Sequence, residues 1–208
     1  MLHASLLSHS PVALLGTEFM RDFYYSFLPA RGLIFGAVAY VDDEPAGFIV
    51  ATDDASGFMG RGIRSGWWRL GGVMLRAVAR HPIERLGAIR EAIGIMRGLP
   101  ASTQPRDYGE LLSFGVLPKY RERAFVARRR LAISRDLATA ALAEMRQRGV
   151  RVCRAIVDAD NLEARLFYVG SGWRPGSDRV PGWRKHTVEF LMDLATPAAA
   201  GETVGATE

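Results

Sequence analysis

A strand, a helix and a second strand follow one another between residues 108 and 157, and this order limits the folds open to the chain. Residues 108–117 form an apolar run that ends at a proline, as expected for a buried strand. The helix over 133–149 keeps one apolar face and ends on Gly149, a typical C-terminal glycine. A strand over 152–157 follows. Since a right-handed crossover joins such strands in parallel, the sequence predicts an α/β domain.

The flanking segments extend this prediction. A mostly helical stretch over 6–28 precedes a hairpin, whose strands over 32–41 and 46–52 meet at an acidic turn. Asp160, with Glu163 three residues later, predicts a capping box at the start of a second helix. A last strand is expected over 188–194, followed by a disordered tail over 196–208. We therefore expect a single domain over 1–195.

Composition and charge exclude several classes of protein. Cys153 is the one cysteine and the four histidines are scattered, so we expect no disulfide framework and no metal site. The net charge of +5 suits an anionic cofactor, an anionic membrane or a nucleic acid. Arginines are dispersed and no reading motif occurs, so no nucleic-acid partner is expected. With neither a secretory signal nor a spanning segment, the chain is expected to be cytoplasmic.

The segment 58–99 is a helical insert that carries Trp67 and Trp68 together with many arginines. Its apolar residues recur at helical spacing, which favours a helical pair packed on the domain, with the tryptophans packed or facing a substrate. The alternative is a Trp- and Arg-rich patch that binds a membrane surface or a protein. Its glycines miss the spacing of a dinucleotide-binding turn, and no strand leads into them.

Two motifs flank the 133–149 helix. The first, V-x-P-x-Y-R, is present at Val116, Pro118, Tyr120 and Arg121. The second, D-N-x-x-A-x-x-F-Y-x-x-x-G-[FW], runs from Asp160 to Trp173. In this order around a helix, they resemble the GNAT acyltransferase superfamily, whose members use acyl-CoA. The resemblance implies a GNAT-type mixed central sheet flanked by helices, with the 58–99 insert between strands 3 and 4.

The family binds the pyrophosphate of CoA with a loop of the form R/Q-x-x-G-x-G/A. Placed directly after Tyr120, this pattern puts the bulky Val126 where a small residue is needed. Placed later, it keeps arginine first and puts Ala132 and Ser134 at the glycine positions, with an insertion across 122–128. The later placement makes the cofactor contacts Arg129, Arg130, Leu131, Ala132, Ile133 and Ser134. Backbone N–H groups at a helix N-terminus are suited to phosphate oxygens.

The resemblance also implies the catalytic residues. Tyr168 corresponds to the acid that protonates the departing CoA thiolate, and Asn161 to a further cofactor contact. Glu110 stands where many members place a base that deprotonates the amine through water. The backbone near Val116 would polarise the thioester carbonyl. For Tyr168 the alternative is a packed aromatic, and for Glu110 a carboxylate at the end of a strand. On the last helix, Leu162, Leu166 and Val169 are expected to face the core.

The sequence therefore predicts an N-acyltransferase that uses acetyl-CoA or another acyl-CoA, with an amine of a small molecule, sugar or peptide as acceptor. The alternative is a non-catalytic GNAT-like module that binds a membrane surface or protein through the insert. The family usually opens with a strand before its first helix, whereas this sequence begins close to that helix. Either this strand is missing, which leaves the next strand at an edge of the sheet, or another segment covers that edge. An exposed edge would favour a homodimer.

Overall fold

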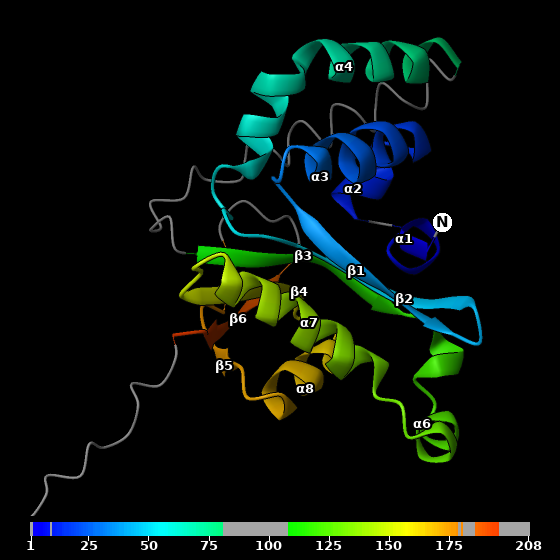
Figure 1. Cartoon of the computed structure of the whole chain (residues 1–208), viewed down its shortest axis with the longest axis vertical. Coiled ribbons are helices and arrows are strands. Elements are labelled where there is room, and N and C mark those ends of the chain that lie inside the picture. The colour runs from blue at the N-terminus through cyan, green and yellow to red at the C-terminus, as the bar shows by residue number, and fades with distance from the viewer. Residues whose placement is uncertain (1, 9, 81–107, 179, 181–185, 196–208) are drawn as a thin grey trace, which may run out of the picture.

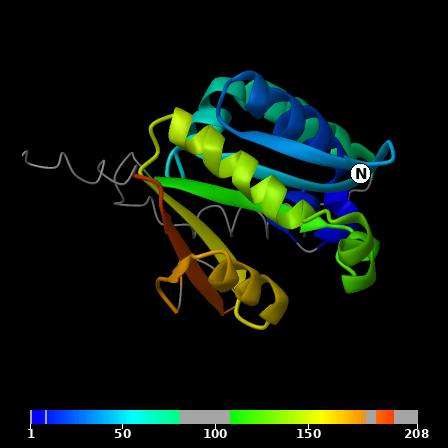
Figure 2. The same ribbon diagram turned by 60° about the horizontal axis from the view of Figure 1, so that its bottom comes forward.

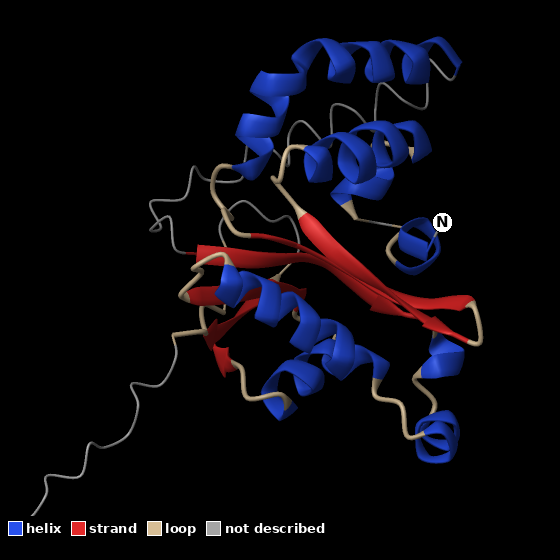
Figure 3. Cartoon of the chain, viewed as in Figure 1, coloured by secondary structure: helices blue, strands red, loops and turns tan. Residues whose placement is uncertain are grey.

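A six-stranded mixed sheet runs through the described part of the chain (Figures 1 and 3). The computed structural model describes residues 2–8, 10–80, 108–178, 180 and 186–195. The strand order is β1-β2-β3-β4-β6-β5, and only β3 and β4 pair in parallel. The strands are β1 (Phe35–Val41), β2 (Glu44–Thr52), β3 (Tyr108–Val116), β4 (Val152–Asp158), β5 (Arg174–Pro175) and β6 (Thr187–Asp193).

Helices cover both faces of the sheet. The N-terminal helices lie on one face and the two later helices α7 and α8 on the other (Figures 1 and 2). The first layer consists of α1 (Leu2–Leu6), α2 (Pro11–Leu14), the π-helix η1 (Phe19–Phe27), α3 (Leu28–Ala30) and α4 (Phe58–Arg80). The later helices are the 3₁₀ turn η2 (Pro118–Tyr120), α6 (Arg123–Arg129), α7 (Ile133–Gln147) and α8 (Leu162–Gly170).

The predicted hairpin is confirmed. Asp42 and Asp43 both take positive φ angles, 49° and 64°, and join β1 to β2 through a two-residue turn. Aspartate tolerates this left-handed region better than most residues, and such turns match the twist of the paired strands. The first strand begins at Phe35 rather than at residue 32, because Gly32 takes a φ of +66° and turns the chain.

The main core lies between the sheet and α7. Leu137, Ala141 and Met145 are buried against β1 and β2, as their helical spacing predicts. Cys153 lies in the same cluster and is fully buried. A second, aromatic cluster fills the other face, where Phe19, Phe23 and other η1 side chains pack against β2. The expected α/β architecture is therefore confirmed, with β1 at the edge of the sheet.

The strands β3 and β4 part after a short parallel contact. Tyr108–Leu111 pairs with residues 152–155, but β3 continues to Val116 and β4 to Asp158 without further pairing between them. Just beyond this contact, β3 carries an extra residue relative to β2, since Val50 pairs with Ser113 and Ala51 with Leu111. This bulge bends β3 away from β4. The middle of the sheet is therefore a wedge that opens toward the ends of both strands.

Two expectations about α8 are wrong. Leu162, Leu166 and Val169 do not face the core, because they are 61%, 63% and 54% exposed. The helix instead packs through the face that carries Phe167 and Tyr168. The capping residue is also one position later than predicted: the Asn161 side chain accepts a hydrogen bond from the N–H of Ala164.

The start of the 58–99 insert is helical, as predicted, and packs on η1 as α4. Two glycines bring the helices close together. A Cβ atom at Gly62 would lie 2.5 Å from the Leu28 side chain, and one at Gly66 would lie 2.5 Å from the Phe27 ring. The rest of the insert and the expected tail lie outside the described residues, so the single domain over 1–195 stays a prediction.

We expect Gly66→Ala to destabilise the protein by about 1–3 kcal/mol, because the new methyl group must displace the buried Phe27 ring. Gly71→Ala is the matched control on the same helix, because nothing lies within 4 Å of a Cβ atom there. This control should stabilise the protein by about 0.5–1 kcal/mol through helix propensity. Urea denaturation measures both effects, and equal effects of the two variants would contradict close packing of α4 on η1.

Candidate functional site

A groove opens between the start of α7 and the outer side of α8. Its volume is about 360 Å³. Three of the predicted cofactor contacts, Ala132, Ile133 and Ser134, line it. The remaining lining residues come from η2, α6, the first turn of α7 and α8: Tyr120, Arg121, Val126, Arg135, Glu163, Leu166, Phe167, Gly170 and Ser171.

The first turn of α7 gives this groove the chemistry of an anion site. Ala132 occupies the N-cap position and has no side-chain oxygen, so no side chain caps the helix. The first N–H groups of a helix have no partner within the helix, and the helix dipole is positive at this end. Arg121 and Arg135 add positive charge at the same opening.

Arg121 forms an ion pair with Glu163 of α8, and both residues line the groove. Sequence reasoning assigned neither residue to the site. It used Arg121 only to recognise a motif and Glu163 only as part of a capping box. Arg121 follows β3 and Glu163 lies on α8, so only the tertiary fold brings the two residues together. No local sequence pattern predicts such a contact.

The other predicted phosphate contacts are Arg129, Arg130 and Leu131, which come just before the groove-lining residues in the sequence. Most of the expected insertion over 122–128 forms α6, which also includes Arg129, and Arg130 ends this helix with a φ of +54°. The Arg129 side chain pairs with Asp42 in the hairpin turn. Arg129, Arg130 and Leu131 are exposed and are not among the lining residues.

The wedge between β3 and β4 lies beside this groove. Phe167 lines the groove and contacts Phe114 of β3, with a ring separation of 5.4 Å. Val116 ends β3 with its side chain in the core. The N–H of the next residue, Leu117, donates to Ala46 of β2. Because successive N–H groups on a strand point to opposite sides, that of Val116 points toward the unpaired side of the wedge.

Glu110 lies on β3 where the two strands still pair, on the face covered by η1. Its carboxylate accepts hydrogen bonds from Arg154 of β4, with Nε–Oε2 and Nη2–Oε2 distances of 2.8 and 2.6 Å. Arg154 also lies 4.0 Å from a Glu189 oxygen. Burial raises the pKa of Glu110, and the Arg154 charge opposes that rise. The group is therefore a buried carboxylate, not a solvated strand end.

Tyr168 lies on the opposite face of the sheet from Glu110, within the main core. Its ring stacks on Phe190 and meets Trp173 edge-on, with centroid distances of 5.4 and 5.0 Å. Burial raises the pKa of the phenol above its ordinary value, which makes the hydroxyl a weaker acid than that of an exposed tyrosine. Asn161 lies outside the groove lining, and its side chain caps α8.

Within the described residues, no cluster of three or more His, Cys, Asp or Glu side chains could hold a metal ion. None of the helices in that part of the chain is long and apolar enough to cross a membrane.

Three features identify the architecture. They are the order of the strands in the sheet, the separation of the parallel strands β3 and β4 at their ends, and the helix that connects these two strands. The crystal structure of SsHAT matches 86% of this chain and 81% of its own, with a TM-score of 0.55 and 17% identity. The chain has the GNAT fold. This agrees with the expectation drawn from the two sequence motifs. Among the described residues, no strand precedes β1, which lies at the edge of the sheet.

Two further GNAT-fold matches are more distant. PaiA N-acetyltransferase from Thermoplasma acidophilum, solved with coenzyme A, has a TM-score of 0.42 and 15% identity; the match covers 77% of this chain and 60% of that one. Ribosomal-protein-S18-alanine N-acetyltransferase from Escherichia coli has a TM-score of 0.44 and 12% identity, covering 84% and 79%. No family model matches the sequence, and comparison with curated proteins gives no match.

The paired charges around Glu110 give a pH-dependent prediction. We expect Arg154→Met to destabilise the fold by about 3–5 kcal/mol at pH 8, because it leaves Glu110 and Glu189 buried without their cation. Without Arg154, the pKa of Glu110 rises further in the folded state. The folded protein then binds protons more tightly than the unfolded chain, so stability falls as pH rises.

The loss should therefore be smaller at pH 5 than at pH 8, measured by urea denaturation at both values. Arg151→Met is the control, because Arg151 is exposed just before β4. An equal loss at both pH values for Arg154→Met would show that the carboxylates do not depend on this arginine.

Proposed function

We propose that this protein is an N-acyltransferase that transfers an acyl group, most simply acetyl, from acyl-CoA to an amine. The observation that carries the proposal is the groove at the start of α7, which combines uncapped helix N–H groups with two arginines. The GNAT fold and the two sequence motifs agree with it. Relatives of this fold include a protein solved with coenzyme A.

The pyrophosphate of the substrate would bind the N–H groups of Ile133, Ser134 and Arg135. A phosphate at this position gains from the helix dipole as well as from hydrogen bonds. Arg121 would turn from Glu163 to the phosphates, since an exposed ion pair costs little to exchange. Arg129 and Arg130 stand just before this turn and would add positive potential at its border.

The thioester would lie in the wedge between β3 and β4, where the Val116 N–H is directed. That N–H would donate to the carbonyl oxygen and stabilise the negative charge that develops there. The nitrogen of a neutral amine attacks the carbonyl carbon, the C–N bond forms and the C–S bond breaks. The amine gives up one proton and the thiolate sulfur takes one, so the products are an amide and a free thiol.

Glu110 and Tyr168 are the groups proposed for the two proton transfers. The raised pKa of Glu110 makes it a stronger base than an ordinary carboxylate, and it lies on the face opposite the groove. The amine would therefore approach from the η1 face, while CoA binds on the α7 and α8 face. The Tyr168 hydroxyl would donate its proton to the thiolate, although the burial that raises its pKa makes it a weaker acid than an ordinary tyrosine.

Acyl-CoA should raise the melting temperature of the protein. At about 100 times Kd the added stability is roughly 2.7 kcal/mol, which corresponds to about 5–10 °C for a chain of this length. The charge reversals Arg121→Glu and Arg135→Glu should abolish this shift, because they place carboxylates in the groove. A differential scanning experiment with acetyl-CoA measures both.

The two controls for that experiment each remove one negative charge, one inside the groove and one outside it. Glu163→Gln should strengthen binding severalfold, because it releases Arg121 from its ion pair. Asp160→Asn removes a nearby exposed charge outside the groove and should have no such effect. If Arg129→Glu with Arg130→Glu abolishes the shift while Arg121→Glu does not, the phosphates bind at the end of α6 instead.

Tyr168→Phe keeps the ring packed against Phe190 and Trp173 and removes only the hydroxyl. We expect turnover to fall by roughly 10²-fold with little change in acyl-CoA affinity, since general acid catalysis contributes about that much. Steady-state kinetics with a panel of amines, beside a thermal-shift titration, separates the two quantities. Unchanged turnover in an active preparation would assign Tyr168 to packing alone.

A further inference from the structure

Two adjacent tryptophans on α4 project into solvent. Trp67 is 71% exposed and Trp68 is 61% exposed, although most large aromatic side chains of the described chain are buried or half-buried. Arg64 and Gly71 are exposed beside them on the same helix. We call these four residues the outer face of α4. Exposed indole rings leave a large apolar surface in water, which is typical of a surface that meets another apolar phase.

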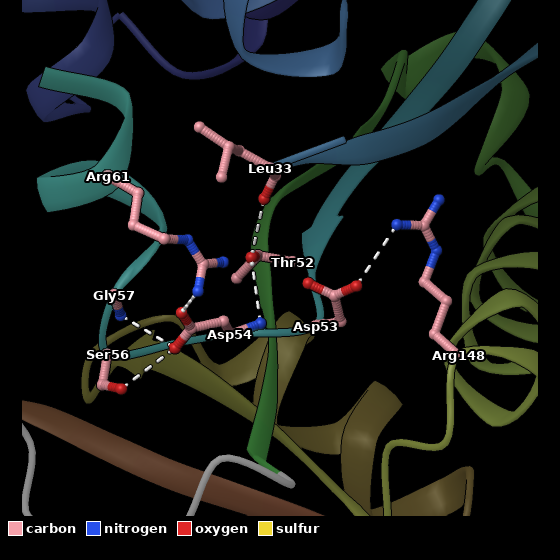
Figure 4. A network of polar contacts seen from close by, with 8 residues as sticks. All are labelled: Leu33, Thr52, Asp53, Asp54, Ser56, Gly57, Arg61 and Arg148. Atoms are coloured by element: carbon pink, nitrogen blue, oxygen red, sulfur yellow. Dashed lines mark hydrogen bonds and ion pairs between the residues drawn. The ribbon is translucent and has the colours of Figure 1, made fainter. Parts of the chain in front are cut away.

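The packing of α4 fixes this face outward. On the opposite side of the helix, Gly62 and Gly66 lie against Leu28 and Phe27, with no space for a larger residue. The helix is also held at its start, where Asp54 accepts a hydrogen bond from the Gly57 N–H, 2.8 Å away, and pairs with Arg61 (Figure 4). The helix bends at Gly66, whose φ and ψ angles of −128° and 22° are not helical. Beyond the bend, the Arg69 guanidinium lies 5.7 Å from the centre of the Phe27 ring, and Leu70 packs against the aromatic cluster. Rotation of this segment that would bury the tryptophans would break these contacts, so their exposure is built into the fold.

The charge of α4 is entirely positive. Its sequence from residue 58 to residue 80 contains five arginines and no aspartate or glutamate. The Arg69 guanidinium lies 5.6 Å from the centre of the Trp68 ring, so positive charge and aromatic surface are adjacent. Tryptophan and arginine side by side match the boundary of a bilayer with anionic headgroups, where the indole enters the headgroup layer and the cation meets phosphate.

We propose that α4 docks the protein on the surface of an anionic phospholipid bilayer through its outer face. The position of the helix leaves the groove accessible in this contact. In Figure 1, α4 lies at the outside of the N-terminal layer, across the sheet from α7 and α8. A bilayer against α4 would therefore leave the groove on the other face open. The inference does not depend on the proposed acyl transfer.

Vesicle flotation tests the proposal with the full chain. The protein should float with vesicles of phosphatidylcholine and phosphatidylglycerol in a 7:3 ratio, and binding should weaken at high salt. Vesicles of phosphatidylcholine alone should bind far less. Quenching of tryptophan fluorescence by brominated lipid should accompany binding, because the indoles enter the headgroup layer.

Trp67→Ser with Trp68→Ser should lower binding to the anionic vesicles by about tenfold or more, since both apolar anchors are lost. Arg64→Gln should lower it about fivefold, the effect of one basic residue near an anionic surface. Both changes lie on exposed positions, so the melting temperature should not fall. Tyr40→Ser, on the exposed edge strand β1, is the matched control and should bind like the unchanged protein.

Three results would overturn the proposal. The first is absence of binding to anionic vesicles, and the second is equal binding to neutral and anionic vesicles. The third is self-association without lipid in analytical ultracentrifugation that disappears when both tryptophans are replaced, because it would assign the outer face to a second copy of the chain.

Discussion

The parting of β3 and β4 is the constraint on which the candidate site depends. Two parallel strands that paired along their whole length would leave no entrance in the middle of the sheet. Here pairing stops at Leu111 and Ala155, and the bulge beside it turns β3 away. Phe167 of α8 packs on Phe114 beyond that point, where the two strands no longer pair. The opening therefore coincides with a change of strand register and with the contact between α8 and β3.

That opening gives the two faces of the sheet different chemistry. On the α7 and α8 face, uncapped N–H groups and arginines favour an anionic group at the groove. On the η1 face, the buried pair of Glu110 and Arg154 provides a carboxylate with a raised pKa. In the proposed reaction, the groove would hold the anionic co-substrate and the carboxylate would accept a proton from the amine. The wedge between the strands would then let the two reactants approach from opposite sides.

Much of the fold was predictable because its elements carry strong local signals. The hairpin follows from its acidic turn, and α7 follows from its apolar spacing and Gly149. Of the predicted cofactor contacts, Ala132 to Ser134 line the groove, and their role in binding stays a prediction. The face of α8 was not predictable, because three apolar residues at helical spacing normally face a core and here face solvent. The Arg121 and Glu163 pair depends on tertiary contact, which no spacing encodes.

Binding of acyl-CoA at the start of α7 is the step on which the proposed function depends. Backbone amide chemical shifts, followed by NMR while coenzyme A is added, test it most directly. The account predicts the largest changes at Ile133, Ser134 and Arg135, with smaller ones at Ser171 across the groove. Binding at this position would be contradicted if saturating coenzyme A left the shifts of these amides unchanged. It would also be contradicted if coenzyme A changed only the shifts of amides outside the groove.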